Sequence, residues 1–241
     1  MTINSTRTVR ELVNEMPGAT RIFEKFKIDY CCGGNAPLTE ACSRAGVDVQ
    51  EITHLLESTA ATKNTAGADY NELSLPALID HIVTKHHVYT KDEMVRLEAL
   101  MNKVVSVHGD NHPELRQVNV LFTRLCEELK PHMFKEEQIL FPYIVQLDRS
   151  VTDKVKAPFA PFGTVNNPVR MMMMEHDAAG EILRKLRKLT SDYAVPADVC
   201  ISYKTLYEAL EALEQDLHQH IHLENNVLFP KAIQVERTIG G

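Results

Sequence analysis

Two stretches of the chain repeat one arrangement of a histidine and a carboxylate. His132 opens the stretch HMFKEEQILFP, and eighty-eight residues later His220 opens HIHLENNVLFP. In both, a glutamate follows four residues after the histidine, as Glu136 and Glu224, and the stretch ends in L-F-P. Side chains four apart on a helix share a face and stand about 6 Å apart at Cβ. An imidazole and a carboxylate at that distance can act together on a metal ion.

Apolar residues at three- and four-residue intervals place both motifs on the buried stripe of a helix. The same spacing puts His176 on the buried stripe of another helix, and either His86 or His87 on that of a fourth. The chain distances favour His87, which precedes His132 by 45 residues, much as His176 precedes His220 by 44. The two helical hairpins therefore look like copies of one another.

Two further histidines accompany the second motif. His218 and His222 fall on the other side of the helix, alongside Glu214 and Gln215. We expect this side to be a hydrated surface.

A single histidine on an apolar stripe is more often a satisfied core residue than a ligand. Six ligand-type groups on four converging helices reverse that expectation. Buried carboxylates need a partner charge or a metal, and the stripes carry no Lys or Arg. Two divalent ions bound by the imidazoles and bridged by the glutamates would neutralise the cluster. Imidazole and carboxylate without thiolate suit iron, manganese or zinc. The predicted ligands are His87, His132, Glu136, His176, His220 and Glu224.

Four long amphipathic helices must position these residues. The periodicity predicts helices over about 73–108, 114–147, 169–189 and 197–235, with no convincing strand. Joined by loops of moderate length, they predict an all-α, antiparallel four-helix bundle. Its motif differs from the Glu-x-x-His of ferritin-like bundles.

A small helical unit precedes the bundle. We predict a domain over 1–57, a linker over 58–72 and the bundle over 73–241. Thr8 with Glu11 resembles a helix-starting capping box. In the loop DYCCGG, the adjacent thiols of Cys31 and Cys32 are expected to have lowered pKa values if they face the start of a helix near Pro37. They serve either as functional thiols or as packing of the small domain.

Composition narrows the classes of function. The 241 residues carry a net charge of −7 and no basic cluster, which excludes a general nucleic-acid binder. No signal peptide or membrane-spanning stretch is evident, so we expect a cytoplasmic protein that does not bind membranes. The odd count of five cysteines indicates reduced thiols. Cys42, Cys126 and Cys200 are interpreted as core or incidental thiols, and the run VRMMMME as core packing.

The repeated H-x-x-x-E with lone histidines on the other two helices is similar to the hemerythrin-like bundle. The runs HMFKEEQILFP, EHDAAGE and HIHLENNVLFP, together with DYCCGG, resemble the bacterial repair-of-iron-centres family over nearly the whole chain. The resemblance implies two non-haem iron ions bridged by the carboxylates of Glu136 and Glu224, with an oxo or hydroxo bridge. It also matches Glu175, which either tunes the site from outside the ligand set or is a solvated carboxylate.

The family's activity gives the leading hypothesis for function. The resemblance implies a protein of the nitrosative and oxidative stress response that repairs damaged iron-sulfur clusters by donating iron, assisted by Cys31 and Cys32. The alternative is an enzyme or scavenger that binds or reduces nitric oxide at the same iron centre, with Glu175 near the proton path, and oxygen binding is a weaker third. Damaged iron-sulfur proteins are the expected partners. Whether the protein is an enzyme, and whether it is a monomer or a homodimer, stay open.

Overall fold

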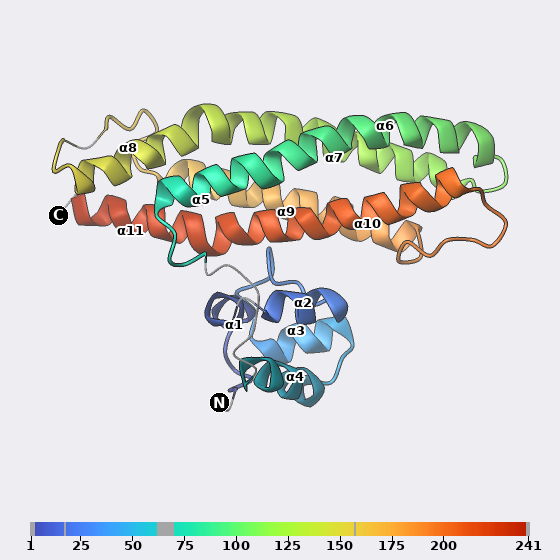
Figure 1. Ribbon diagram of the computed structural model, residues 1–241, viewed down its shortest axis with the longest axis horizontal. Coiled ribbons are helices and arrows are strands. Elements are labelled where there is room, and N and C mark those ends of the chain that lie inside the picture. Colours follow the sequence, from blue (N-terminus) through green and yellow to red (C-terminus); the bar gives the residue numbers. More distant parts are fainter. Residues whose placement is uncertain (1–2, 17, 62–69, 157, 240–241) are drawn as a thin grey trace.

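The computed structural model describes residues 3–16, 18–61, 70–156 and 158–239, in which the regular secondary structure is helical. Within these ranges β structure is limited to one isolated bridge between Thr8 and Pro37. Figure 1 shows a long helical bundle with a smaller helical unit beneath its middle. The all-α prediction is confirmed.

Three of the four long helices of the bundle contain a π-helical segment, and the third, α9 (Asn166–Leu189), is α-helical throughout. The first runs through α5 (Leu75–His81), η1 (Ile82–His87) and α6 (Val88–His108). The second runs through α7 (Glu114–Lys135), η2 (Glu136–Leu140) and α8 (Phe141–Thr152). The fourth runs through α10 (Ile201–His222), η3 (Leu223–Leu228) and α11 (Phe229–Ile239).

The bundle has two apolar cores, one toward each end. The first is formed by α6, α7, α9 and α10, and includes Phe122, Leu183 and Leu213. The second is formed by α5, η2, α8, η3 and their neighbours, and includes Ile82 and Phe229. The histidines and glutamates of the repeated motif lie between them along each helix. The cores therefore fix the four helices on both sides of a buried polar layer.

The N-terminal unit has a core of its own, built around Phe23, Leu38 and Ile52. Its helices are α1 (Val9–Glu15), α2 (Ala19–Lys25), α3 (Leu38–Ala45) and α4 (Val49–Ala61). Thr8 and Glu11 form the predicted capping box at the start of α1. Residues 58–61 of the predicted linker belong to α4, and residues 62–69 lie outside the described part of the chain.

Specific hydrogen bonds join the unit to the bundle. The Asn226 side chain donates to the carbonyl of Tyr30 at 3.0 Å, and Asn14 donates to the carbonyl of Asn226 at 3.1 Å. His218 Nδ1 lies 3.0 Å from a carboxylate oxygen of Glu24. These contacts fix the loop that carries the adjacent cysteines against the bundle.

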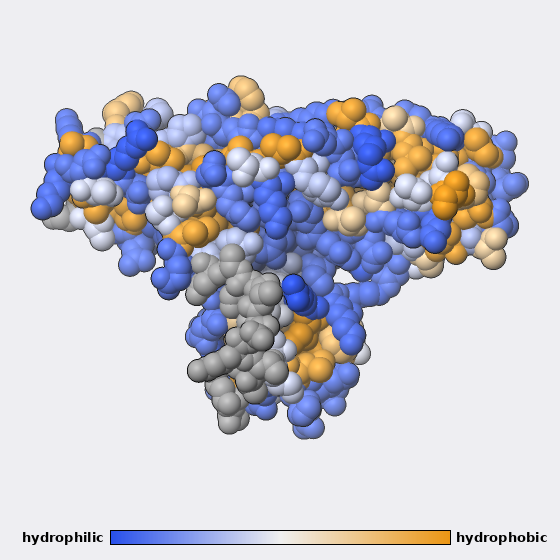
Figure 2. All heavy atoms as spheres, in the orientation of Figure 1, coloured by the Kyte–Doolittle hydropathy of each residue, from blue (hydrophilic) through white to orange (hydrophobic). Residues whose placement is uncertain are grey.

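The exposed surface of the bundle is mainly polar. Figure 2 shows mostly hydrophilic side chains on one face of the bundle, with apolar ones scattered among them. No helix in the described ranges combines the length and the apolar character needed to cross a membrane.

Candidate metal centre

The π-helical segments coincide with the predicted ligands. His87 ends η1, Glu136 begins η2, and Glu224 lies in η3. Such segments are rare and occur often at functional sites, because the extra residue in the turn redirects the side chains that follow. The buried polar layer is thus where the helices depart from α geometry.

The six predicted ligands come together as two overlapping groups. In one, which we call position A, ligand atoms of His87, His220 and both glutamates lie within 4.8 Å of one another. In the other, position B, His132 and His176 take the place of the first two histidines. All six side chains are at most 3 % exposed, and both glutamates are 0 % exposed. Because Glu136 and Glu224 belong to both groups, the arrangement suits two ions that share them.

The imidazole geometry fits a metal. In each position the two histidines point their Nε2 atoms at one another, 3.0 Å apart in both cases. Two nitrogens bound at right angles to one ion, at about 2.1 Å each, are separated by about this distance. Nδ1 of His87 lies 2.7 Å from the carboxylate of Glu137, and Nδ1 of His132 lies 2.7 Å from that of Glu175. An ionised carboxylate accepts hydrogen bonds and cannot donate them. The hydrogen therefore sits on Nδ1, and Nε2 of each of these two rings presents a lone pair.

The carboxylates also fit a cation. Both oxygens of Glu136 and one of Glu224 are buried and make no hydrogen bond to the described residues. Burial and the neighbouring Glu224 raise the pKa of Glu136 well above its ordinary value. Burial opposes ionisation of Glu224 too, but its imidazole neighbours, His220 first, lower its pKa overall. Divalent ions would stabilise two buried carboxylates that lie this close to each other.

Two residues outside the ligand set were missed from the sequence. Glu137 holds Nδ1 of His87, and Asn225 Oδ1 accepts the Nδ1 hydrogen of His176 at 2.8 Å. Each directly follows the motif glutamate of its own hairpin, so the internal repeat contained the signal. Such contacts set the tautomer and orientation of a ligating imidazole.

Glu175 takes a similar position beside His132. Its carboxylate accepts from Nδ1 of His132 at 2.7 Å and forms an ion pair with Lys135. The hydrogen bond from His132, against the opposing effect of partial burial, and the contact with Lys135 lower the pKa of Glu175 to about 2. Glu175 is therefore an ionised acceptor that orients His132.

Of the two candidates on the first helix, the structure places His87 in the cluster and His86 outside it. His86 is also buried, but its Nδ1 lies 2.9 Å from a carboxylate oxygen of Asp216. Its ring stacks on that of His220, with centroids 5.8 Å apart.

The adjacent cysteines lie beside position B. Cys32 Sγ is 3.6 Å from the carbonyl oxygen of His176, and the Asn225 side chain donates to the carbonyl of Cys31 at 3.4 Å. Ligand atoms of Asp29, Cys31 and Cys32 form a third group within 4.8 Å. The expected lowering of the thiol pKa is wrong for Cys31. Contact with Cys32 and burial raise its pKa well above the ordinary value, and the nearby Asp29 raises it further. The backbone amides of the loop donate to Asp29 and not to a thiolate.

The prediction of a wet surface at His218 and His222 is also wrong. The N-terminal unit covers this side of α10, so that His222 is 4 % exposed and bonded to Asn226. Burial and the nearby Arg10 lower the pKa of His222 to about 4. Burial would lower the pKa of His218 as well, but the hydrogen bond with Glu24 raises it overall.

The structure agrees only in part with the interpretations of the methionine run and of the other three cysteines. Met172 is buried as expected for core packing, whereas Met171 and Met174 are exposed. Cys42 and Cys126 are buried thiols, but Cys200 is exposed and lies 3.1 Å from Nε2 of His108.

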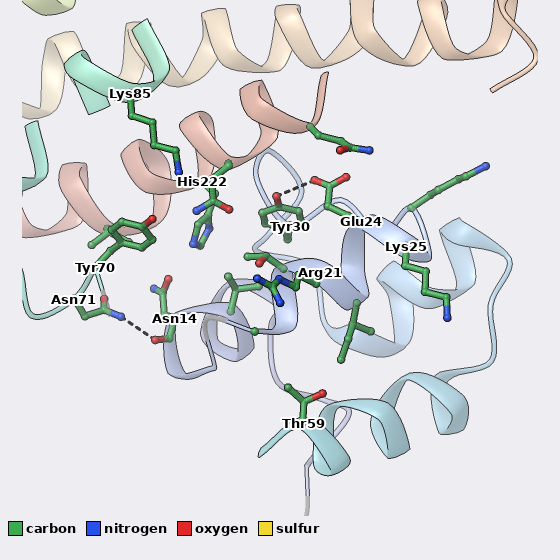
Figure 3. Close-up of a pocket in the computed structure, with 18 of the residues that line it drawn as sticks. Asn14, Arg21, Glu24, Lys25, Tyr30, Thr59, Tyr70, Asn71, Lys85 and His222 are labelled. Carbon is green, nitrogen blue, oxygen red and sulfur yellow. Dashed lines mark hydrogen bonds between the residues drawn. The ribbon is translucent and has the colours of Figure 1, made fainter. Parts of the chain in front are cut away.

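Two cavities lie apart from the six ligands. One of about 850 Å³ opens between the domains, lined in part by Asn14, Tyr30 and His222 (Figure 3). Another of about 690 Å³ is lined by Asp29, Cys32 and other residues at the edge of the small domain. The second cavity makes the Cys32 thiol accessible while Cys31 stays buried.

Comparisons with known proteins agree with this geometry. The Hemerythrin profile, described as the hemerythrin HHE cation binding domain, matches residues 78–232. ScdA_N, described as a domain of unknown function, matches residues 5–60.

Relatives match nearly the whole chain. A protein named "Probable iron-sulfur cluster repair protein" from Haemophilus influenzae is 35% identical over 224 residues, covering 92% of this chain and 95% of that protein. The "Iron-sulfur cluster repair protein YtfE" of Enterobacter sp. (strain 638) is 37% identical over 226 residues, covering 94% and 96%. The chain belongs to the family of iron-sulfur cluster repair proteins and carries its cation-binding hemerythrin domain.

Proposed function

We propose that this protein repairs damaged iron-sulfur clusters by supplying iron from a centre of two non-haem ions. The observation that carries the proposal is the pair of overlapping four-residue groups that share Glu136 and Glu224. His87 and His220 would hold one ion, and His132 and His176 the other. An oxo or hydroxo bridge would complete the centre. When bound, the ions supply the iron that a damaged cluster lacks.

The protein's own residues keep this iron available. The ligand set of imidazoles and carboxylates suits divalent iron and includes no thiolate. The two apolar cores exclude water from the polar layer on both sides along the bundle. This exclusion of water would protect bound iron from hydrolysis and uncontrolled oxidation.

The loop with the adjacent cysteines is proposed to contact the damaged client. Cys32 is accessible from a cavity at the edge of the small domain, and Asp29 and Cys31 bring two further ligand atoms close to it. Thiols suit contact with an iron-sulfur cluster because thiolates are its usual ligands. A Cys31→Ser/Cys32→Ser variant should keep its iron and transfer it more slowly.

Iron transfer can be tested on a dehydratase whose cluster has been damaged with nitric oxide. The iron-loaded protein should restore its activity in the presence of a chelator that captures free ferrous ions. Glu136→Ala and Glu224→Ala, which lack a shared ligand, should not. Recovery with a simple ferrous salt but none with the loaded protein would reject the proposal.

Reduction of nitric oxide is the alternative use of the same centre. Coupling two molecules to nitrous oxide and water takes two electrons and two protons. Glu175, the residue expected near the proton path, is ionised and occupied by His132 and Lys135, which favours a positioning role. Gas chromatography decides between the two functions, because nitrous oxide in excess of one molecule per centre would establish turnover.

A further inference from the structure

The two metal positions are not equivalent, although the hairpins that build them repeat one another. The repeat relates His87 to His176 and His132 to His220. It also relates the residues just before the lone histidines, which are Glu175 in the second hairpin and His86 in the first. A carboxylate thus stands at one place where its counterpart is an imidazole.

The difference between Glu175 and His86 determines whether the adjacent ligand histidine has a hydrogen-bond acceptor at Nδ1. Glu175 accepts the Nδ1 hydrogen of His132 at 2.7 Å. At the related place His86 is paired through Nδ1 with Asp216 and stacks against the ring of His220, with 9° between the ring planes. Nδ1 of His220 is left buried with no acceptor among the described residues.

Position A therefore lacks one outer contact that position B has. At position B both histidines are held through Nδ1, His132 by Glu175 and His176 by Asn225. At position A, among the residues that the structure describes, only His87 is held through Nδ1, by Glu137. An acceptor at Nδ1 makes Nε2 a stronger electron donor, and its loss typically weakens metal binding by about 10- to 100-fold.

We propose that the two ions are held unequally, that the ion bound by His87 and His220 leaves first, and that the exchange of Glu175 for His86 sets this order. The inference rests on the proposed two-ion centre and specifies which ion the protein can give up. The loop with Cys31 and Cys32 lies beside His176, at the firmly held position.

The test follows the release of iron from the protein loaded with two ferrous ions, without oxygen, into excess chromogenic chelator. We expect two phases of equal amplitude, with rate constants that differ about 10- to 100-fold. A single phase that releases both ions would overturn the inference while leaving the two-ion centre intact. Failure to load two ions would remove both.

Two substitutions test whether His86 and Glu175 cause the difference in release rate. His86→Gln places a carbonyl acceptor near Nδ1 of His220 and should slow the fast phase toward the slow one. Glu175→His recreates the environment of His86 and should accelerate the slow phase. Glu137→Gln, which weakens the contact to His87, is the matched control and should accelerate only the fast phase. Unchanged rates in His86→Gln, with the helix content and two-ion loading of the parent, would exclude His86 as the cause.

Equilibrium binding gives a second readout that does not depend on catalysis. Zinc titration in competition with a chelator should give two affinities for the parent protein, about 10- to 100-fold apart. The two values should converge in His86→Gln, and one shared affinity in the parent would contradict the inequality.

Discussion

The Nε2 atoms of His132 and His176 face one another 3.0 Å apart in a layer that both glutamates share. The Nδ1 contacts to Glu175 and Asn225 keep the hydrogens on the far side of the two rings. Two lone pairs at this distance repel unless a cation lies between them. The stability of the buried layer should therefore depend on bound cations.

Removing the metal should lower the melting temperature. A ligand at a thousand times its Kd stabilises the native state by about 4 kcal/mol. For a chain of this size each kcal/mol shifts melting by about 2–4 °C, which predicts a loss of about 8–16 °C by calorimetry. Replacing Glu136 and Glu224 together by glutamine removes the buried charge and should shrink the difference between loaded and metal-free forms. Glu181→Gln, at an exposed carboxylate, should preserve it. Equal melting with and without metal in the parent would contradict the assignment of the layer.

The bundle was predictable because helical periodicity records which face is buried. The stripes around His132, His176 and His220 could be identified from spacing alone, and the structure buries all three. The π-helical turns at η1, η2 and η3 were not predictable, since they depend on how the helices meet the polar layer. The roles of Glu137 and Asn225 could have been inferred by aligning the two hairpins.

Contacts between domains explain the wrong predictions. His222 reads as a surface residue because periodicity describes one helix and carries no information about the unit that covers it. The pKa of the Cys31 thiol depends on which acceptor the backbone amides of its loop bind. The amides of Cys31, Cys32 and Gly33 all donate to Asp29. Neither the covering of His222 nor the acceptor of the loop amides can be inferred from the local sequence.

Asn226 should hold the small domain in place. Its side-chain amide donates both to the Tyr30 carbonyl and to Nδ1 of His222, linking the cysteine loop to the bundle. Asn226→Ala leaves buried polar groups unpaired at a cost of about 1–3 kcal/mol. We expect the opening equilibrium of the interface to rise about 5- to 150-fold, measured as faster hydrogen exchange in the loop around Tyr30. Asn102→Ala, on the exposed side of α6, is the control. Unchanged exchange in Asn226→Ala would show that other contacts carry the interface.

A buried ion pair joins α9 to α10 near the same interface. The guanidinium of Arg187 donates to Glu214 at 2.8 Å, and the Glu214 side chain is 2 % exposed. Arg187→Met removes the guanidinium from that carboxylate, which keeps His218 Nε2 at 3.8 Å as a neighbour, and should cost about 3 kcal/mol in denaturant unfolding. The double variant Arg187→Met/Glu214→Met should recover most of the loss, since it removes both charges. Arg116→Met, in an exposed pair with Asp110, should cost less than about 1 kcal/mol. A double variant no more stable than the single one would contradict this account.

Cys200 should be the thiol that reacts near neutral pH. Its hydrogen bond with His108 and the backbone amides at the start of α10 lower its pKa to about 7. Alkylation requires the thiolate, so its rate should rise with pH and reach half its maximum near pH 7. His108→Ala removes the main cause and should move the midpoint up toward about 8.5, the value of a free cysteine. Burial raises the pKa of Cys126 to about 11, which makes it an internal control that stays unlabelled across this range. A midpoint near 8.5 in the parent protein, unaffected by His108→Ala, would show that the histidine contact does not activate the thiol in solution.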